Sequence, residues 1–574
     1  MNYKLEIEKL VGHDKESQVG KLHIGVGDKI VVGDEVCTLE SGKGTAVVET
    51  NASGTVLEVL VAEGDMVKKG SVVVVMDADE ASIVTASTPD KKSKGTKKGY
   101  SFGLSKPKKE TIETDVLIIG GGPGGYVAAL HGAKLGKKVT LIEKEALGGT
   151  CLNWGCIPTK ALAHTAHVLE NIQEAHLLGI ETKGAQLNMG AAINRKNQVV
   201  ETLTGGIAYL LENAGIRVID GEAVAVDAHT VTVNNKKTDA TIKAEHIIIA
   251  TGASPTRLPI DGADLEGVVT SRELLDIETV PERLIVIGGG VIGMEFAFIM
   301  NAFGAKVTVI EFQNQLLSVL DQDVIDVIVE EACEKGIEIK TGSAVQEIIE
   351  SDDKQMIVRY ETDDKTHYAT GDLVLMATGR KANTTAIDLN VLGVALNERA
   401  NGIEVSQTLQ TSVENIYAIG DVTNKIQLAH VASHQGIVAM DNIAGKTAIM
   451  HYDTVPSAIF TTPEIGSVGV TEQEAKAAGI PYKTSIFSFA GNGKALAMDA
   501  PKGFVKLIAD ETTDCIIGGS VVGIHGTDML PAIVHLMQHN IKVEEAMHTI
   551  YAHPTAAEGI HEAILGLKGL MLHG

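Results

Sequence analysis

The chain has 574 residues, of which 44% are hydrophobic and 21% charged, and its formal net charge is −25. Because one hydrophobic core cannot organise a chain of this length, we expect about three to five domains. The negative charge argues against nucleic acid or an anionic membrane as a partner, and the sequence contains no apolar run long enough to span a bilayer.

The N-terminal segment predicts a small all-β unit over residues 1–80. Its valine-rich alternating segments are separated by Gly-Asp turns, and GDKIVVGDEV (27–36) is repeated as GDMVKKGSVV (64–73). Two like halves predict a two-sheet structure with quasi-two-fold symmetry, with Lys43 between them at a hairpin tip. The first ten residues, MNYKLEIEKL, lack the apolar region of a signal peptide, so we expect a cytoplasmic protein.

Residues 81–112 are rich in Lys, Ser, Gly and Thr and predict a flexible linker. A coil of this length spans roughly 30 Å on average and roughly 110 Å when fully extended. Its positive charge favours a solvated, self-repelling spacer, and docking on an acidic partner surface is the alternative.

From residue 113 onward strands alternate with helices, and a second, longer repeat appears. The segments TDVLIIGGGPGGYVAA (114–129) and ERLIVIGGGVIGMEFA (282–297) each consist of an apolar strand, a glycine turn and the start of a helix. Each copy continues into a second strand that ends in an acid. The fingerprint glycines G-x-G-x-x-G and the acids are Gly120, Gly122, Gly125 and Glu143 in the first copy, and Gly288, Gly290, Gly293 and Glu311 in the second.

This order of elements is typical of dinucleotide-binding units. The first glycine allows a tight turn, the second lets the backbone approach a pyrophosphate, and the third lets the helix pack on the strand, so that the pyrophosphate meets free N–H groups. The acid binds ribose hydroxyls, and at Glu311 it would repel a 2′-phosphate, which favours NAD over NADP. Two such units predict electron transfer between two cofactors, FAD in the first and NAD in the second.

Further cofactor contacts are expected downstream of the fingerprints. The segments IIIATGASP (247–255) and VLMATGRKAN (374–383) are strand-to-loop turns that contain Thr-Gly. Asp421 lies just past the strand of IYAIGDV, where its carboxylate suits the hydroxyls of a flavin. The assigned residues are Thr251, Gly252, Asp421 and Ala429 on the flavin side and Gly379 on the nicotinamide side.

Two of the five cysteines lie close together in GGTCLNWGCIPTK (148–160). Such a sparse, odd count is unlike a secreted disulfide framework. In a regular helix, residues i and i+5 are about 8–9 Å apart, beyond the roughly 7 Å limit for a disulfide. Cys151 and Cys156 can therefore join only where a helix is distorted or begins, as Gly155 and Pro158 allow.

The pair can serve as a redox centre, as zinc ligands or as inert thiols. The start of a helix lowers the pKa of a thiol, which suits exchange chemistry. The C-x4-C spacing lacks a second ligand pair, since His164 and His167 follow alone on the next helix. The redox pair is favoured, and we expect Cys37, Cys333 and Cys515 to be packing residues.

The cysteine motif, the two fingerprints, the Thr-Gly turns and YAHPTAAE (551–558) together resemble the flavin disulfide reductases, and among them the dihydrolipoamide dehydrogenases. The resemblance covers residues from about 113 to 574. It implies that Cys151 exchanges with a dithiol substrate and that Cys156 lies nearest the flavin. It also implies that Lys160 lies near the flavin N5 with Glu295 as its ion-pair partner.

Thiol–disulfide exchange needs an acid–base group, and His553 is the candidate, with Glu558 orienting its ring. In the family that the chain resembles, this histidine comes from the other subunit. The resemblance therefore implies a homodimer with the C-terminal domain as its interface. The chain departs from the family at Tyr551, where histidine is frequent, and in HVASHQG (430–436), where Glu-Gly is common instead of Gln-Gly.

The first 80 residues resemble a lipoyl domain, which implies covalent lipoate on Lys43. The family pattern at this tip is an acid, then Lys, then Ala, whereas this chain has Ser41, Gly42, Lys43 and Gly44. A biotin carrier would place Met on both sides of the lysine. No metal site is expected.

The expected fold is α/β, with two Rossmann-like dinucleotide-binding domains and a C-terminal α+β dimerisation domain, preceded by the lipoyl-like domain. The predicted boundaries are 1–80 lipoyl domain, 81–112 linker, 113–258 FAD-binding domain, 259–385 NAD-binding domain, 386–453 central domain completing the FAD site, and 454–574 dimerisation domain.

The expected function is NAD-dependent oxidation of protein-bound dihydrolipoamide, with a lipoylated acyltransferase or carrier protein of a multienzyme complex as partner. The expected complex is a 2-oxo acid dehydrogenase, acetoin or glycine-cleavage complex. One alternative is a reductase of another disulfide, such as glutathione disulfide. A lipoyl carrier or assembly role is compatible with either. A mercuric reductase is disfavoured because Cys515, the last cysteine, has no neighbouring cysteine.

Overall fold

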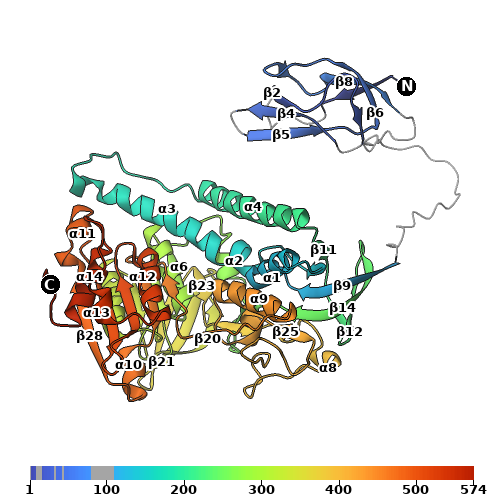
Figure 1. Cartoon of the computed structure of the whole chain (residues 1–574). Coiled ribbons are helices and arrows are strands. Elements are labelled where there is room, and N and C mark those ends of the chain that lie inside the picture. The colour runs from blue at the N-terminus through green and yellow to red at the C-terminus, as the bar shows by residue number, and fades with distance from the viewer. Residues whose placement is uncertain (1, 8–15, 32–33, 42–43, 79–108, 574) are drawn as a thin grey trace. The chain divides into compact units, whose positions relative to one another are not determined.

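The computed structural model (Figure 1) describes residues 2–7, 16–31, 34–41, 44–78 and 109–573. The chain divides into two units, Met1–Phe102 and Gly103–Gly574. Among the described residues, no helix combines the length and apolar character needed to cross a membrane.

The first unit consists of two four-stranded antiparallel sheets, in the orders β1-β8-β6-β3 and β5-β4-β2-β7. The strands are β1 (Asn2–Glu6), β2 (Ser17–Leu22), β3 (Lys29–Ile30), β4 (Glu35–Ser41), β5 (Gly44–Glu49), β6 (Gly54–Val59), β7 (Met66–Val67) and β8 (Val72–Ala78). Alternate side chains such as Leu39, Val73 and Met76 are fully buried between the sheets. This arrangement confirms the predicted all-β unit.

The sequence repeat of the first unit has a structural counterpart in its turns. The Asp28 carboxylate accepts the Gly25 N–H at 2.7 Å, and the Asp65 carboxylate accepts the Ala62 N–H at 2.8 Å. The short strands β3 and β7 follow these two turns at equivalent positions. Lys43 lies outside the described residues, in the connection between β4 and β5, whose pairing extends to Ser41 opposite Gly44.

The second unit begins with a sheet in the order β11-β10-β9-β14-β13-β12, to which β25 is added beside β14. The pairs β11–β10, β10–β9, β9–β14 and β14–β25 are parallel. The pairs β14–β13 and β13–β12 are antiparallel. The strands are β9 (Lys109–Ile119), β10 (Val139–Glu143), β11 (Arg217–Asp220), β12 (Val224–Asp227), β13 (Thr230–Asn234), β14 (Asp239–Ile249) and β25 (Ile416–Ala418). Since β9 begins at Lys109, it includes the last four residues of the predicted linker, and the domain boundaries stay predictions.

Several helices pack against strands of this sheet or against one another, and α1 packs against α9 although the two are far apart in the chain. They are α1 (Pro123–Lys134), α2 (Gly149–Trp154), α3 (Cys156–Glu174), α4 (Met189–Asn213), α8 (Leu389–Leu392) and α9 (Ala429–Ile443), with 3-10 turns η2 (Ala175–Leu178) and η3 (Gly420–Thr423). Figure 1 shows α3 and α4 as two long helices lying alongside each other.

A second parallel sheet has the order β16-β23-β17-β18-β19 and is followed by the antiparallel sheet β20-β21-β22. Its elements are β16 (Val268–Val269), α5 (Ser271–Leu274), β17 (Arg283–Ile287), α6 (Val291–Ala302), β18 (Lys306–Ile310), α7 (Gln322–Glu334), β19 (Glu338–Lys340), β20 (Ala344–Glu350), β21 (Met356–Thr362), β22 (Lys365–Gly371) and β23 (Leu373–Met376). The short pair β15 (Ala253–Pro255) and β24 (Arg380–Ala382) joins the segments that leave the two parallel sheets.

The C-terminal part is an antiparallel sheet in the order β26-β27-β30-β29-β28, with α12 packed on β27 and β30 and α14 packed on β28 and β29. Its elements are β26 (Ser457–Ile459), β27 (Ile465–Gly469), α10 (Glu472–Ala477), β28 (Tyr482–Ser488), η4 (Phe489–Gly491), α11 (Gly493–Ala497), β29 (Phe504–Asp510), β30 (Ile516–Val522), α12 (Gly526–Gln538), α13 (Val543–Ala546) and α14 (Glu558–Gly566).

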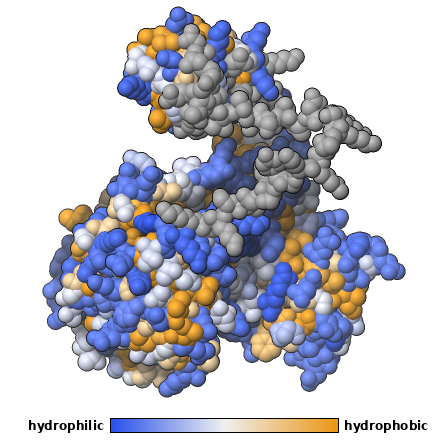
Figure 2. Space-filling view, turned by 90° about the vertical axis from the view of Figure 1, so that its right-hand side faces the viewer, coloured by the Kyte–Doolittle hydropathy of each residue, from blue (hydrophilic) through white to orange (hydrophobic). Residues whose placement is uncertain are grey.

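The central strands explain why the two nucleotide-binding halves fold alike. Residues 116–119 of β9 and 284–287 of β17 are continuous aliphatic runs, and every one of these residues is at most 4% exposed. Such runs are typical of parallel strands that are covered on both faces. The predicted α/β fold is confirmed. On the surface drawn in Figure 2, hydrophilic and hydrophobic residues are interspersed.

Candidate active site

The two neighbouring cysteines lie on either side of a helix break. Cys151 belongs to α2, and Cys156 begins α3. Between them Gly155 has φ −145° and ψ −115°, and a Cβ there would lie 2.9 Å from the Thr150 carbonyl oxygen. The break at Gly155 therefore provides the distortion that the sequence required for Cys151 and Cys156 to meet.

Both cysteines are free thiols in this structure, and each lies close enough to the other to shift its pKa. The hydrogen bond from Cys151, assisted by the charge of Lys160, lowers the pKa of Cys156 to about 7. The same hydrogen bond, together with burial, raises the pKa of Cys151. The pair thus holds one proton on Cys151 and favours a thiolate at Cys156.

Lys160 and Glu295 form the expected ion pair close to the cysteines. Lys160 Nζ donates to Glu295 Oε1 at 2.9 Å and to Oε2 at 2.8 Å. The Glu295 side chain is only 6% exposed, and its Oε1 also accepts the Phe460 N–H at 2.9 Å. The carboxylate is buried and held by a second segment, so it keeps the half-buried Lys160 ammonium group in one place.

The first and third glycines of both fingerprints are required by the fold itself. Gly120 and Gly288 have φ of +108° and +109°, values that favour glycine. A Cβ on Gly125 would lie 1.8 Å from the Gly120 oxygen, and one on Gly293 would lie 1.9 Å from the Gly288 oxygen. These four glycines form the tight turn and the close packing of helix on strand, as predicted.

The middle glycines are different, because the chain itself leaves room for a side chain. A Cβ on Gly290 would meet nothing within 4 Å, and one on Gly122 would meet only Gly149 at 3.9 Å. Among the described residues, no side chain caps the helices α1, α6 and α9 that begin at these turns and at Ala429. Open backbone and uncapped N–H groups fit the pyrophosphates of two dinucleotides.

The two strand-end acids have the same geometry in both halves. Glu143 accepts the Gly121 N–H at 2.6 Å through Oε2 and the Glu145 N–H at 2.7 Å through Oε1. Glu311 accepts the N–H groups of Gly289 and Gln313 at the same two distances. These contacts orient each carboxylate at the glycine turn, where it is expected to accept hydrogen bonds from ribose hydroxyls.

The second half contains a cavity of about 500 Å³ at its glycine turn. Four of the residues that line it were predicted from the sequence: Gly288, Gly290, Glu311 and Gly379. Phe312, Thr378 and Arg380 also line it, and the sequence did not assign them to the site. Gly293 and Glu295 are not among the lining residues: Gly293 packs the helix and Glu295 binds Lys160. The cavity fits a nicotinamide dinucleotide.

Replacing Gly290 by alanine tests this cavity. Because Gly290 has φ −77° and its Cβ position is open, we expect the variant to fold normally. We expect the KM for NAD to rise about tenfold or more, since the added methyl group meets the pyrophosphate. Steady-state kinetics with varied NAD measure the effect. The control is Gly206→Ala, an equally unobstructed position in α4, and equal KM values for both variants would contradict the assignment.

On the flavin side the structure brings together segments that are distant in sequence. Thr251 donates through Oγ1 to the Asn383 oxygen at 3.1 Å, and the Asn383 N–H donates to the Gly252 oxygen at 2.9 Å. Burial raises the pKa of Asp421, and the charge of Arg380, whose Nε lies 3.9 Å from Asp421 Oδ2, acts against that rise. A buried carboxyl of this kind suits hydrogen bonding to a flavin hydroxyl.

Arg380 was not singled out from the sequence. Its guanidinium also donates to the Ala253 oxygen and, at 3.4 Å, to the hydroxyl of Thr150, the residue before Cys151. The only sequence signal was its position directly after the Thr-Gly turn, within the quoted segment VLMATGRKAN.

His553 and Glu558 also meet as expected. Nδ1 of His553 lies 2.9 Å from Glu558 Oε1, and Glu558 Oε2 accepts the Thr555 N–H at 2.8 Å. Although burial acts against the charged form, these hydrogen bonds hold the pKa of Glu558 below its usual range. The His553 side chain is 79% exposed in this chain, so a second molecule can reach it.

Two departures from the family pattern are integrated into the packing. Gln435 is fully buried, accepts the Gly420 N–H at 2.6 Å and donates to the Tyr452 hydroxyl at 3.0 Å. Tyr551 stacks on the ring of His561, with centroids 5.4 Å apart. One expectation about the remaining cysteines is wrong: Cys333 is exposed and is not a packing residue, whereas Cys37 is buried.

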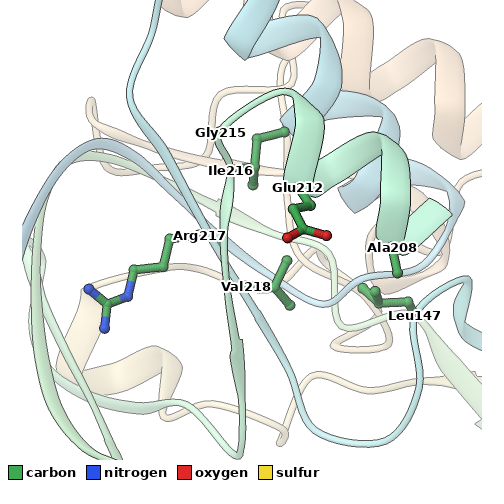
Figure 3. Close-up of a pocket in the computed structure, with 7 residues that line it drawn as sticks. All are labelled: Leu147, Ala208, Glu212, Gly215, Ile216, Arg217 and Val218. Carbon is green, nitrogen blue, oxygen red and sulfur yellow. The ribbon is translucent and has the colours of Figure 1, made fainter. Parts of the chain in front are cut away.

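A second cavity, of about 420 Å³, contains none of the predicted residues. It lies between the end of α4 and the edge strand β11 and is lined by Leu147, Ala208, Glu212, Gly215, Ile216, Arg217 and Val218 (Figure 3). Arg217 points away from the other lining side chains, and its guanidinium reaches Glu110 at 2.5 Å. We assign no chemistry to this cavity.

Comparison with known proteins defines the class. Residues 114–436 match the family model of the pyridine nucleotide-disulphide oxidoreductases, and residues 455–564 match the dimerisation domain of the same family. Residues 11–76 match the model described as biotin-requiring enzyme, which comprises biotin and lipoyl domains. The chain belongs to the pyridine nucleotide-disulphide oxidoreductases and carries an N-terminal domain with a lipoyl-type attachment lysine.

Within this family, curated relatives of the chain include dihydrolipoyl dehydrogenases. The enzyme of Geobacillus stearothermophilus is 38% identical over 462 residues, which are 80% of this chain and 98% of that protein. The enzyme of Chlamydia pneumoniae is 39% identical over 464 residues, 81% of this chain and 99% of that protein. Such enzymes use FAD and NAD.

Solved structures show the same architecture. LpdA from Mycobacterium tuberculosis superimposes with a TM-score of 0.74 at 29% identity, covering 79% of this chain and 99% of that one. The flavoprotein disulfide reductase RclA from Escherichia coli has a TM-score of 0.71 at 30% identity, with the same coverage. The dimerisation domain supports a homodimer, and the lipoyl-type domain suggests membership of a multienzyme complex.

Proposed function

We propose that this chain is a dihydrolipoyl dehydrogenase, which oxidises protein-bound dihydrolipoamide and reduces NAD. The observation that carries the proposal is the pair Cys151 and Cys156 on either side of a helix break, near an ion pair in which the buried Glu295 holds Lys160. The relatives named above support the choice of substrate. Glu311 at the cavity rim favours NAD over NADP and argues against an NADPH-dependent reductase of glutathione disulfide.

The chain's own residues have the following roles in the oxidising direction. One sulfur of the dithiol attacks Cys151, the Cys151–Cys156 disulfide breaks, and Cys156 leaves as a thiolate, which its pKa of about 7 favours. The second sulfur of the substrate then displaces Cys151, which closes the lipoamide disulfide and leaves both cysteines reduced. His553 of the partner subunit accepts one substrate proton while Glu558 holds its ring, and the other proton ends on Cys151.

A bound FAD would supply the two-electron chemistry that links the reduced cysteines to NAD. The residues that would hold the flavin are Gly120, Gly122, Gly125, Glu143, Thr251, Gly252, Asp421 and Ala429. Those that would hold NAD are Gly288, Gly290, Glu311 and Gly379. Lys160, held by Glu295, would present its ammonium group near the flavin N5.

The proposal is tested by anaerobic titration of the purified protein with dihydrolipoamide, followed by NAD. We expect a long-wavelength thiolate-to-flavin absorbance to grow with the dithiol and to disappear as NADH forms. An oxidised flavin that dihydrolipoamide leaves unchanged, but that NADH reduces, would refute the substrate. A parallel assay with glutathione disulfide and NADPH separates the alternative.

Lys43 is proposed to carry covalent lipoate, so that the first domain supplies or accepts a lipoyl group. Mass analysis of peptides from protein made in a lipoylating host is expected to show the mass of lipoate on Lys43. A lipoylated acyltransferase or carrier protein is the proposed partner, in the cytoplasm and without nucleic acid or membrane contact. Unmodified Lys43 in every peptide would remove the basis for a carrier role.

The proposed domains keep the predicted boundaries of 1–80, 81–112, 113–258, 259–385, 386–453 and 454–574. Tethering by a linker of this length would give a lipoyl group an effective concentration of around millimolar at reachable sites.

A further inference from the structure

The single tryptophan of the chain stands between the two reactive cysteines and is covered by a charged side chain from a distant segment. Arg272 Cζ lies 3.8 Å from the centroid of the Trp154 ring, which is a cation–π contact. The same guanidinium donates from Nη1 to Glu145 Oε2 at 3.0 Å. An aromatic ring, a cation and a carboxylate thus meet next to the redox segment.

The three residues come from different parts of the second unit. Trp154 ends α2 and directly precedes the break at Gly155, and Glu145 follows β10, the strand that ends in Glu143. Arg272 lies in α5, whose start is fixed by a capping box in which the Thr270 N–H donates to Glu273 Oε2 at 2.7 Å. Arg272 therefore has a rigid base.

Arg272 belongs to the same half of the second unit as the nucleotide cavity. Its helix α5 follows β16, and β16 pairs with β23 through Val268 opposite Val374. Just beyond β23 the chain reaches Thr378 and Gly379, which line the cavity of about 500 Å³. The contact of Arg272 with Trp154 therefore joins the nicotinamide half to the helix that carries Cys151.

Asn153 and Thr159 already fix the backbone around Gly155 locally, by donating to the oxygens of Gly149 and Gly155. Because a glycine leaves the backbone free to adopt many conformations, a contact from outside the segment adds to this support. We propose that Arg272 is a positioning residue of the redox centre: by stacking on Trp154 and binding Glu145, it holds α2 at the angle that brings Cys151 to Cys156. The inference rests on the proposed function only for the assignment of the cysteine pair as the redox centre.

Arg272→Met tests this role, because it keeps the length of the side chain and removes its charge and donors. We expect kcat for dihydrolipoamide oxidation to fall about three- to tenfold, the range for an exposed cation–π contact with an exposed ion pair. Reduction of ferricyanide by NADH, which bypasses the cysteines, should keep the wild-type rate. Arg272→Lys, which retains a cation, should restore part of the loss.

Two spectroscopic measurements on the full-length holoenzyme separate positioning from a general loss of stability. Acrylamide should quench the emission of Trp154 more strongly in Arg272→Met, and the pH at which the reduced protein develops thiolate absorbance should move upward as the Cys151–Cys156 hydrogen bond weakens. Both effects are independent of the dithiol substrate. If the wild type fails to oxidise dihydrolipoamide, the proposed function fails while these measurements still decide the role of Arg272.

The matched control is Arg217→Met. Arg217 is 49% exposed and pairs with Glu110, as Arg272 is 46% exposed and pairs with Glu145, but it lies on the edge strand β11. Unchanged quenching, titration and turnover in Arg272→Met would overturn the proposal. Equal losses in Arg217→Met, or equal loss of flavin from both variants, would also overturn it.

Discussion

Replacing Cys156 by serine is expected to abolish electron transfer from dihydrolipoamide to NAD while the flavin stays bound. Serine is nearly isosteric but cannot form the Cys151–Cys156 disulfide. Since this disulfide is the proposed electron acceptor, we expect turnover to fall by about four orders of magnitude or more, as for the loss of an essential nucleophile. Stopped-flow formation of NADH measures the loss, and the flavin spectrum of the purified variant verifies cofactor binding.

The same variant makes a pH-dependent signal disappear. The hydrogen bond from Cys151 and the charge of Lys160 lower the pKa of Cys156 to about 7. Ultraviolet thiolate absorbance of the reduced wild type should therefore increase as the pH rises through about 7, because a thiol loses its proton above its pKa. In Cys156→Ser this step should be absent.

The exposed Cys333 supplies the control for both measurements. Cys333→Ser removes a thiol far from the fingerprints and the redox segment in sequence, and it should preserve turnover and the thiolate step near neutral pH. Residual turnover above about one per cent in Cys156→Ser would contradict the assignment, since no second sulfur could then be required.

Replacing His553 by glutamine is expected to lower kcat for dihydrolipoamide oxidation by about 10²- to 10⁴-fold, the usual contribution of a general acid–base group. Glutamine keeps hydrogen-bonding atoms but cannot accept and release a proton near neutral pH. NADH-driven reduction of ferricyanide should be unaffected, because that reaction involves no thiol exchange. The measurement is the ratio of the two activities in the same preparation.

Glu558→Gln should produce a smaller loss, of about tenfold. Its hydrogen bonds from Thr555 and His553 hold the pKa of Glu558 below its usual range, so a carboxylate orients the imidazole throughout the neutral pH range. The neutral amide keeps the contact and loses the charge. The matched control for His553→Gln is His548→Gln, because His548 is an exposed histidine five residues before His553. A ratio equal to that of the wild type in His553→Gln would remove this residue from the mechanism.

Much of the site could be predicted from the sequence because its requirements are local. A tight turn forces the left-handed backbone of Gly120 and Gly288, and a helix starting against its own strand forces Gly125 and Gly293. Likewise, two cysteines five positions apart cannot meet on a regular helix, so Gly155 had to interrupt it. Each of these constraints acts within a few residues and determines the residue type at that position, so it can be seen in the sequence.

Other predictions from the sequence depended on the resemblance to a family. Nothing in the spacing of Lys160 and Glu295, or of His553 and Glu558, specifies a flavin or a second subunit. The structure adds the contacts within each pair, and the roles stay proposals. The exposure of Cys333 shows the limit of composition, because a cysteine on an amphipathic helix can lie on either face.

The contacts that only the tertiary structure decided join residues far apart in the chain. Lys506, with its side chain 3% exposed, binds Asp321, Asp323 and Glu472 and so fastens α7 to the C-terminal sheet. Arg380 reaches Asp421, and Arg272 covers Trp154. The sequence by itself determined the fold class, the two fingerprints and the cysteine pair, since periodicity and turn geometry are local. Which charged side chains meet was decided by how the packed domains close on one another, because burying a charge is tolerated only where a partner arrives from another element.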